Sequence, residues 1–282
     1  MINVSQQELL DAGVHFGHLK RKWNPKMAPY IFMERNGIHI LDLNKTHAKL
    51  AEAASAMRQI AKSGKKILFV ATKKQAKDIV ANAAKSVNMP FINERWPGGM
   101  LTNFATQRKS VKKMMSFDKF MSDGTYAVLS KKEKLNVSRQ KAKMEKVLGS
   151  IADLTRLPAA IFVVDIVREH IAVAEANKLN IPIIGICDTN SDPSQVDFAI
   201  PGNDDATKSI SLILKIMVKS IEEGLAERAE DKDADKENDE DQIASAAGAN
   251  ISEEEEDDKG AKKKTNLRPR KTTARKPAKQ KD

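Results

Sequence analysis

Two histidines near the start of the chain have the spacing of metal ligands. His15 and His18 lie in the segment GVHFGH, where a separation of three residues can place both rings on one face. Zinc takes three or four protein ligands, so two histidines need further donors. Asp188 closes a predicted strand and Asp205 opens a predicted helix, so both could supply oxygen atoms if the fold brings them near. A structural metal ion at His18, Asp188 and Asp205 stays open, and the alternative is hydrogen bonding among these side chains.

A glycine pair poses a second question, because glycine-rich loops bind phosphate groups. Gly98 and Gly99 stand in the segment RWPGGMLTNF. Dinucleotide-binding loops read G-x-G-x-x-G and P-loops read G-x-x-x-x-G-K-[ST], and neither pattern occurs around this pair. The first strong predicted strand leads into Thr72-Lys73-Lys74-Gln75, which has no glycine to let a pyrophosphate approach the backbone. These features favour an architectural bend over a nucleotide site.

Such a bend would turn the chain into the helix that follows it. Gly98 and Gly99 can adopt backbone angles that other residues resist. Trp96 would pack there as an anchor, and Thr102 or Asn103 would cap the next helix, because their side chains can bind a backbone amide. We therefore expect these five residues to form a structural hinge.

No Ser/His/Asp or Cys/His grouping stands out as catalytic. Group-transfer or hydrolytic chemistry needs a nucleophile or a paired acid and base within reach. The single cysteine, Cys187, lies in a predicted core strand, where a thiol is inert, and one cysteine fits a reducing cytosol. We therefore predict a protein that is not an enzyme, with no catalytic residue and no cofactor apart from the open metal site.

Positive charge is concentrated in one segment. The 282 residues carry a net charge of +10. Residues 101–150 hold 12 Lys/Arg and 4 Asp/Glu, a net of +8. Concentrated charge is expected of a surface that binds a polyanion, whereas scattered charge marks a solvated helix face. The clustering favours a polyanionic partner.

A second basic cluster lies nearer the start. Its basic members are Lys20, Arg21, Lys22, Lys26 and Arg35. The aromatic residues among them are Trp23, Tyr30 and Phe32. Cations can bind RNA phosphates, and aromatic rings can stack on unpaired bases. We expect the lysines and arginines to contact RNA, and Tyr30 and Phe32 to lie in the core.

Alternating strands and helices predict a doubly wound α/β fold. Near-continuous Val/Ile runs suit strands that are buried on both faces of a parallel sheet. Such runs lie at 66–71, 160–165 and 181–188, with weaker candidates at 37–41, 90–93 and 198–200. Helical patterns lie at 44–63, 72–87 (with Thr72 as its cap), 169–178 and 205–227. The order predicts a mainly parallel sheet flanked by helices, in an α/β sandwich domain made of residues 1–101 and 156–227.

Residues 102–155 break this alternation and predict an inserted helical hairpin. Apolar residues recur at three- and four-residue spacing on both sides of an interruption at 122–125. Two such helices can pack as an antiparallel, coiled-coil-like arm whose lysines point outward. The Met and Phe residues would then form the seam of the arm and not a cofactor site.

Residues 228–282 have the composition of a disordered tail. They are acidic up to Asp258 and basic from Lys259, with few apolar residues to offset the entropy of folding. Across the chain, no run approaches the ~18 apolar residues of a membrane helix. The start, MINVSQQELL, also lacks a secretory signal. We expect a cytoplasmic protein without a membrane partner, and the role of the tail stays open.

Five segments together resemble the bacterial small-subunit ribosomal protein S-two family. They are GVHFGH at 13–18, WNPKM at 23–27, RWPGGMLTN at 95–103, NIPIIGICDTNSDP at 180–193 and VDFAIPGNDDA at 196–206. The resemblance covers residues 3–226, with the helical arm between the third and fourth segments. The tail departs from the family pattern, so its role is not implied by the resemblance.

The resemblance implies an α/β sandwich with a protruding hairpin, in a structural protein of the ribosome that catalyses no reaction. It implies binding to the ribosomal RNA of the small subunit near the head–body junction. It also implies contact with neighbouring proteins, including help in docking the large messenger-binding ribosomal protein that carries repeated OB domains.

From the charge pattern, we expect the phosphate contacts to come from the arm and its root. The candidates are Lys22, Lys26, Arg108, Lys112, Lys113, Lys131, Lys132, Lys134, Arg139 and Lys141. The competing hypotheses are an α/β nucleotide-binding enzyme with a basic helical insertion and a scaffold for acidic protein partners.

Overall fold

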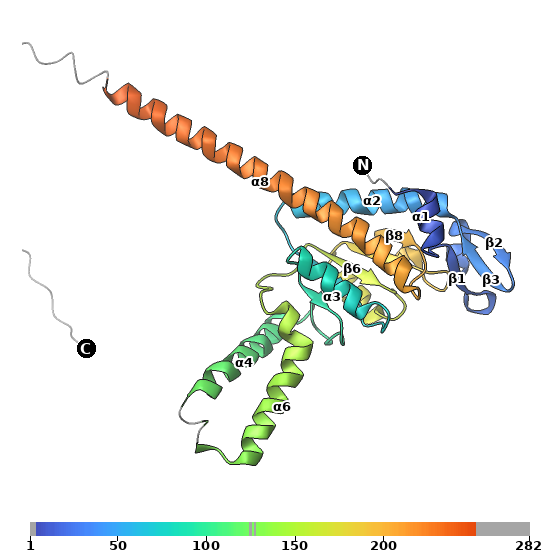
Figure 1. The fold of residues 1–282 in the computed structure, drawn as a ribbon, viewed down its shortest axis with the longest axis horizontal. Helices are drawn as coiled ribbons and strands as arrows, with labels where there is room; N and C mark the ends of the chain where they lie inside the picture. Colours follow the sequence, from blue (N-terminus) through green and yellow to red (C-terminus); the bar gives the residue numbers. More distant parts are fainter. Residues whose placement is uncertain (1–3, 124–125, 127, 252–282) are drawn as a thin grey trace, which may run out of the picture. The chain divides into compact units, whose positions relative to one another are not determined.

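A five-stranded parallel sheet forms the core of the compact unit Met1–Asp231 (Figure 1). The computed structural model describes residues 4–123, 126 and 128–251, with the backbone alone for 232–251. The spatial order of the strands is β5-β4-β6-β7-β8, and each neighbouring pair is parallel. The strands are β4 (Ile67–Val70), β5 (Phe91–Ile92), β6 (Ala160–Val164), β7 (Ile183–Cys187) and β8 (Phe198–Pro201). The predicted doubly wound, mainly parallel α/β fold is confirmed.

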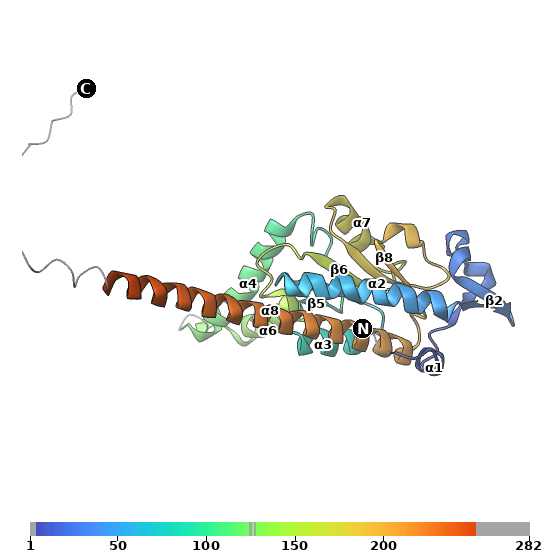
Figure 2. The same cartoon turned by 90° about the horizontal axis from the view of Figure 1, so that it is seen from above.

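Both faces of this sheet are buried, because successive side chains of each strand point into two different apolar clusters. One cluster contains Phe69 and Phe162, whose ring centroids lie 5.4 Å apart, and it includes residues of helices α1, α2, α3 and α8. The other contains Leu68 and Val163 and includes residues of α7 and of the root of the arm. Figure 2 shows α7 on one side of the sheet and α2, α3 and α8 on the other.

The helices of these two layers differ from the predicted ones at two ends. Their bounds are α1 (Gln6–Asp11), α2 (Leu43–Lys62), α3 (Lys77–Ser86), α7 (His170–Lys178) and α8 (Thr207–Ile251). Thr72 does not cap α3, which begins at Lys77 and has no side-chain cap among the described residues. Helix α8 continues past Glu227, where the sequence places its end, and residues 252–282 of the predicted tail lie outside the described residues. The described helices include none that is long and apolar enough to cross a bilayer.

Helices α2 and α8 approach each other closely at Gly224. A Cβ atom built on Gly224 would lie 2.3 Å from the carbonyl oxygen of Arg58, well inside any normal contact. Arg58 and Lys62, near the end of α2, form ion pairs with Glu227 of α8. A glycine is therefore required for this crossing.

A small antiparallel sheet, in the order β1-β3-β2, packs beside the parallel one. Its strands are β1 (Phe16–Leu19), β2 (Ile31–Arg35) and β3 (Ile38–Leu41), with 3-10 turns η1 (Lys20–Lys22) and η2 (Pro25–Tyr30) after β1. The turn between β2 and β3 uses Asn36 and Gly37, whose φ angles of 54° and 75° suit a tight hairpin. Thr189, after β7, ties the two sheets together, because its hydroxyl accepts the amide of His18 at 2.8 Å.

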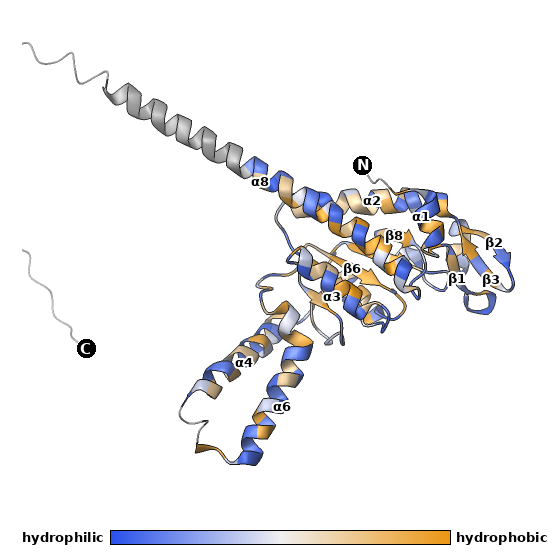
Figure 3. Cartoon of the chain, viewed as in Figure 1, coloured by the Kyte–Doolittle hydropathy of each residue, from blue (hydrophilic) through white to orange (hydrophobic). Residues whose placement is uncertain are grey.

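The predicted hairpin arm is formed by α4 (Phe104–Ser122) and α6 (Lys131–Leu148), followed by the 3-10 turn η3 (Gly149–Ile151). Hydrophilic and hydrophobic residues alternate along both helices (Figure 3). Val111, Met114 and Leu148 are buried, so the apolar seam lies near the root. Met115 and Leu135 are 43% and 49% exposed, so these two residues lie outside the seam.

Candidate functional site

The glycine-containing loop before α4 binds an internal carboxylate. Glu175 of α7 is buried and accepts five hydrogen bonds from this loop. Its Oε1 accepts the Trp96 indole N–H at 3.0 Å and the Gly99 amide at 2.8 Å. Its Oε2 accepts the Leu101 amide at 2.9 Å and both the amide and the hydroxyl of Thr102 at 3.1 Å. Burial raises the pKa of Glu175, but these hydrogen bonds lower it more, so the pKa lies below its usual value.

This arrangement decides what the glycine pair does. Gly99 has a φ of 78°, which side chains resist, whereas a Cβ on Gly98 would meet nothing within 4 Å. Asn103 occupies the N-cap position of α4, but its side chain makes no cap hydrogen bond within the described chain. Thr102 donates to Glu175 instead, so neither residue caps α4 through its side chain as predicted. The loop donors that a phosphate would need are already bound to Glu175.

A second internal carboxylate, Glu169, lies beyond the carboxyl ends of the neighbouring strands β4 and β6. The strand order reverses there, which is where α/β sheets commonly bind ligands. Glu169 accepts the backbone amide of Thr72 at 2.8 Å and also its hydroxyl. Arg168 donates to the same hydroxyl at 3.0 Å. Burial raises the pKa of Glu169 above its usual value despite the hydrogen bonds from Thr72.

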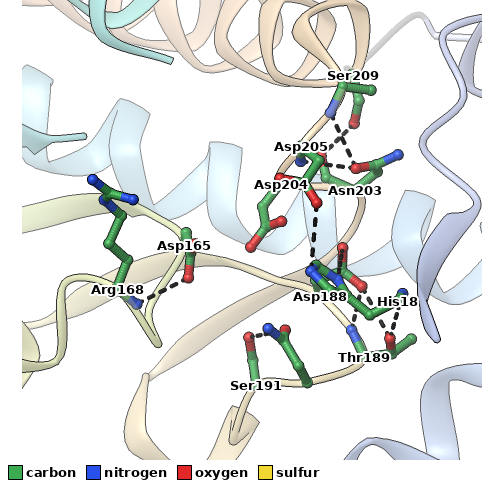
Figure 4. Close-up of polar contacts among 12 residues, drawn as sticks. His18, Asp165, Arg168, Asp188, Thr189, Ser191, Asn203, Asp204, Asp205 and Ser209 are labelled. Carbon is green, nitrogen blue, oxygen red and sulfur yellow. Dashed lines mark hydrogen bonds and ion pairs between the residues drawn. The ribbon is translucent and has the colours of Figure 1, made fainter. Parts of the chain in front are cut away.

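Polar residues also gather at the carboxyl ends of β7 and β8 (Figure 4). His18 Nδ1 lies 3.0 Å from Asp188 Oδ2, and His18 Nε2 lies 3.4 Å from Asp205 Oδ2. The structure thus brings together the three metal candidates taken from the sequence. It adds Asp204, because ligand atoms of His18, Asp188 and Asp204 all lie within 4.8 Å of one another. His15 is not in this group, and its Nδ1 has no partner among the described residues.

An internal cation already neutralises part of this acidic cluster. Lys73 Nζ lies 2.8 Å from Asp204 Oδ1, 2.6 Å from Asp205 Oδ1 and 3.3 Å from Asp165 Oδ2. Burial opposes the charge of Lys73, but hydrogen bonds to Asp204 and Asp205 raise its pKa above the usual value. Burial, together with the nearby carboxylates, raises the pKa of Asp204 to about 7. The cluster is therefore held together by hydrogen bonds and ion pairs without any added ion.

One oxygen atom of the cluster is left without a hydrogen-bond partner among the described residues. Asp204 is fully buried, and its Oδ2 has no hydrogen-bond partner among the described residues. A buried carboxylate oxygen without a partner is costly unless a cation or a proton meets it. Imidazole and carboxylate donors are ligands that zinc accepts. Sequence reasoning missed Asp204 and Lys73, although Lys73 follows β4 and so lies at the same edge of the sheet.

The predicted RNA-binding cations divide into two sets. Four are engaged within the chain: Lys26 with Asp192 at 2.7 Å, Arg108 with the carbonyl oxygen of Ala152 at 2.9 Å, Lys141 with Asp118, and Lys134 over the Tyr126 ring at 5.7 Å. The others are exposed, and their side chains make no hydrogen bond or ion pair with the described residues: Lys22, Lys112, Lys113, Lys131, Lys132 and Arg139. All of the second set except Lys22 lie on the arm.

The small antiparallel sheet exposes several apolar side chains. Phe32 is 70% exposed, Phe16 is 49% exposed, and Met33 and Leu19 are also exposed. The expectation that Phe32 lies in the core is wrong, because β2 is an edge strand whose outer side chains meet solvent. Trp23 is partly exposed and lies against the buried His39 ring, with the ring centroids 5.3 Å apart and the ring planes tilted by 45°. Phe16 and Phe32 are the exposed aromatic residues of this sheet.

Comparison with known proteins gives the family of the chain. Residues 9–224 match the family described as ribosomal protein S2. The chain belongs to the ribosomal protein S2 family. The small ribosomal subunit protein uS2 of Bacteroides thetaiotaomicron is 66% identical over 232 residues, which cover 82% of this chain and 84% of that protein. The protein of the same name from Flavobacterium johnsoniae is 64% identical over 232 residues, covering 82% and 91%.

Membership in the ribosomal protein S2 family confirms the resemblance drawn from the five sequence segments. The chain is a structural constituent of the small ribosomal subunit, acts in translation in the cytoplasm and is not an enzyme. Glu175 and Glu169 accept hydrogen bonds from the backbone amides that a nucleotide phosphate would need at these two loops.

Proposed function

We propose that the chain binds the ribosomal RNA of the small subunit near the head–body junction, with the arm as its main RNA contact. Exposed cations of α4 and α6 bind backbone phosphates, and each contact releases counterions condensed on the RNA. Phosphate contacts set the register of the protein without reading base sequence. Specificity then comes from the shape of folded RNA.

The observation that carries this proposal is the set of arm cations left without an internal partner. Lys112, Lys113, Lys131 and Lys132 are exposed, and none of their ammonium groups makes a hydrogen bond or ion pair with a described residue. A cation already paired with a carboxylate would have to give up that pair before it could bind a phosphate. Lys26 and Lys141 are paired with carboxylates, and Arg108 donates to the Ala152 carbonyl oxygen, so these three residues contribute less to RNA binding.

Charge reversal on the arm tests the proposal. Replacing Lys112, Lys113, Lys131 and Lys132 with glutamate should abolish incorporation into small subunits while the circular dichroism spectrum of the chain is retained. Normal incorporation of this folded variant would contradict the proposal. If ribonuclease treatment releases the wild-type chain from its complex, a scaffold that binds only proteins would be excluded.

The finer part of the proposal concerns a neighbouring protein. We assign the exposed aromatic residues Phe16 and Phe32 to contact with a neighbouring ribosomal protein, including the docking of the large messenger-binding protein with repeated OB domains. Exposed aromatic side chains are typical anchors of protein interfaces. Phe32→Ala should lower retention of that neighbour on assembled subunits, while Phe120→Ala, near the outer end of α4 in the arm, should not. Equal retention of the neighbour by both variants would overturn the assignment.

A second candidate function is binding of one divalent metal ion at His18, Asp188 and Asp204. The supporting observation is the buried Asp204 oxygen without a partner. Calorimetric titration of the full chain with zinc alone should show one site, which Asp204→Asn should weaken by tenfold or more. A chain whose unfolding temperature and titration heat are unaffected by zinc would leave hydrogen bonding as the whole role of the cluster.

A further inference from the structure

We propose that Glu175 is the positioning residue that sets the direction in which the arm leaves the sheet. Glu175 lies on α7, while the groups bonded to its carboxylate lie 73 to 79 residues earlier, in the loop that leads into α4. The last of these groups, Thr102, stands two residues before Phe104, where α4 begins. Only the consequence for RNA binding rests on the proposed function.

The five hydrogen bonds hold the loop on both sides of its bend. Oε1 holds Trp96 and Gly99 on one side of the bend, and Oε2 holds Leu101 and Thr102 on the other. Hydrogen bonds depend strongly on angle, whereas apolar contact does not. A single carboxylate that bonds to both sides therefore fixes the angle of the bend, and with it the direction of the helix that follows.

The other contacts at the root are less able to fix this direction. Arg108 of α4 donates one hydrogen bond to the Ala152 carbonyl oxygen at 2.9 Å, but this bond joins the two ends of the arm to each other. Val111, Met114, Leu148 and Ile151 bury apolar surface there, and apolar packing allows sliding and rotation. The ion pair between Lys146 of α6 and Glu94 joins side chains that are 66% and 27% exposed, at 3.4 Å. Exposed pairs of this kind contribute little, at most about 1 kcal/mol.

Burial makes Glu175 hard to replace by water. Glu175 is 8% exposed, and its partners Trp96 and Leu101 are 6% and 2% exposed. Without the carboxylate, these donors lose their acceptor in a place that solvent does not reach. The loop must then open to satisfy them, which changes the angle at which α4 begins.

Distance measurement between two spin labels tests this inference in the full chain. We would place labels at Ser116→Cys on α4 and Ser211→Cys on α8, because both serines are exposed. Cys187 is buried and its thiol pKa is raised, so it will not take the label. Glu175→Gln keeps the side-chain shape, turns one acceptor into a donor and should at least double the width of the distance distribution. Amide exchange at Leu101 should become about tenfold faster, as expected for the loss of one buried hydrogen bond.

A matched control separates positioning from general loss of stability. Val80→Ala removes buried apolar atoms of α3, in the cluster on the opposite face of the sheet from the arm. It should lower the unfolding temperature without broadening the distribution of distances between the labels. The inference is wrong if Val80→Ala broadens the distance distribution as much as Glu175→Gln does. It is also wrong if Glu175→Gln leaves the distribution narrow.

Chemical rescue adds a readout that a merely structural role would not give. Glu175→Ala leaves space that acetate can enter with its carboxylate among the loop donors. Added acetate should narrow the distribution of label distances again, and acetamide of the same shape should not. Equal effects of the two compounds would contradict a role for the carboxylate.

Incorporation into subunits separates this inference from the proposed function. A broadened distance together with lost incorporation supports both. A broadened distance with unchanged incorporation supports Glu175 as the residue that sets the arm and overturns the arm as an RNA contact. A narrow distance in Glu175→Gln overturns the positioning role, whatever happens to incorporation.

Discussion

Neutralising four arm lysines should change how strongly salt weakens binding to the small subunit. The variant replaces Lys112, Lys113, Lys131 and Lys132 with glutamine. These residues are exposed and have no internal partner within the described chain, so the arm itself should stay folded. Glutamine and lysine also have nearly equal helix propensities. The substitution therefore removes positive charge and leaves both helices of the arm folded.

The expected size follows from counterion release. Each phosphate contact contributes about 0.7 to 0.9 to the slope of log affinity against log salt, so four contacts contribute about 3 to 4. Between about 50 and 200 mM salt, a fourfold change, the wild-type chain should lose roughly 50- to 150-fold more affinity than the variant. Most of the difference between the two proteins should therefore appear at low salt.

The assay is co-sedimentation with small-subunit particles depleted of this protein, over a salt series. A matched control replaces four exposed lysines of the α/β domain, away from the arm, and should change the slope by less than half as much. The control positions are Lys65, Lys178, Lys208 and Lys215. A slope in the arm variant that equals the wild-type slope would refute the reasoning, because charge on the arm would then make no phosphate contact.

Three further predictions concern stability and reactivity. Gly224→Ala should destabilise the chain by about 1–3 kcal/mol in urea unfolding, because its Cβ would collide with the Arg58 carbonyl oxygen; an exposed helical glycine would instead gain stability from alanine. Hydrogen bonds from Lys26 and from its own turn lower the pKa of Asp192 to about 2, so the ion pair stabilises the fold above pH 3.8 and loses this effect as pH falls toward 2. The urea midpoints of Asp192→Asn and wild type should therefore differ at pH 6 and converge near pH 2. Cys187 is buried with a raised pKa, so it should react with a thiol reagent only after unfolding, and fast reaction in the native chain would show that the strand opens.

The buried elements of the fold could be predicted from the sequence because their pattern is local. Strands β4, β6 and β7 are continuous runs of apolar residues, and all of their residues are buried. Strands β1 and β2 escaped prediction because few of their side chains are buried, so their apolar and polar residues do not alternate in a recognisable way. The first helix, α1, is only six residues long and has one buried residue.

The site could be predicted in part, for a related reason. Asp188 follows β7, and residues after parallel strands meet at one edge of the sheet, so its proximity to other polar groups could be expected. Which of Asp204 and Asp205 turns inward depends on the turn between β8 and α8, which local pattern does not determine. The bond between Glu175 and the loop at Gly99 joins residues 76 apart, and nothing in either segment indicates the other.

Directed cleavage of the RNA from the arm tests the central claim most directly. An iron chelate attached at Ser138→Cys, an exposed position on α6, produces hydroxyl radicals that cut nearby RNA backbone. If the arm binds folded ribosomal RNA, assembled subunits carrying this protein should show strong cuts in the small-subunit RNA. Assembled subunits that contain the labelled chain but show no cut from Ser138→Cys would contradict the account.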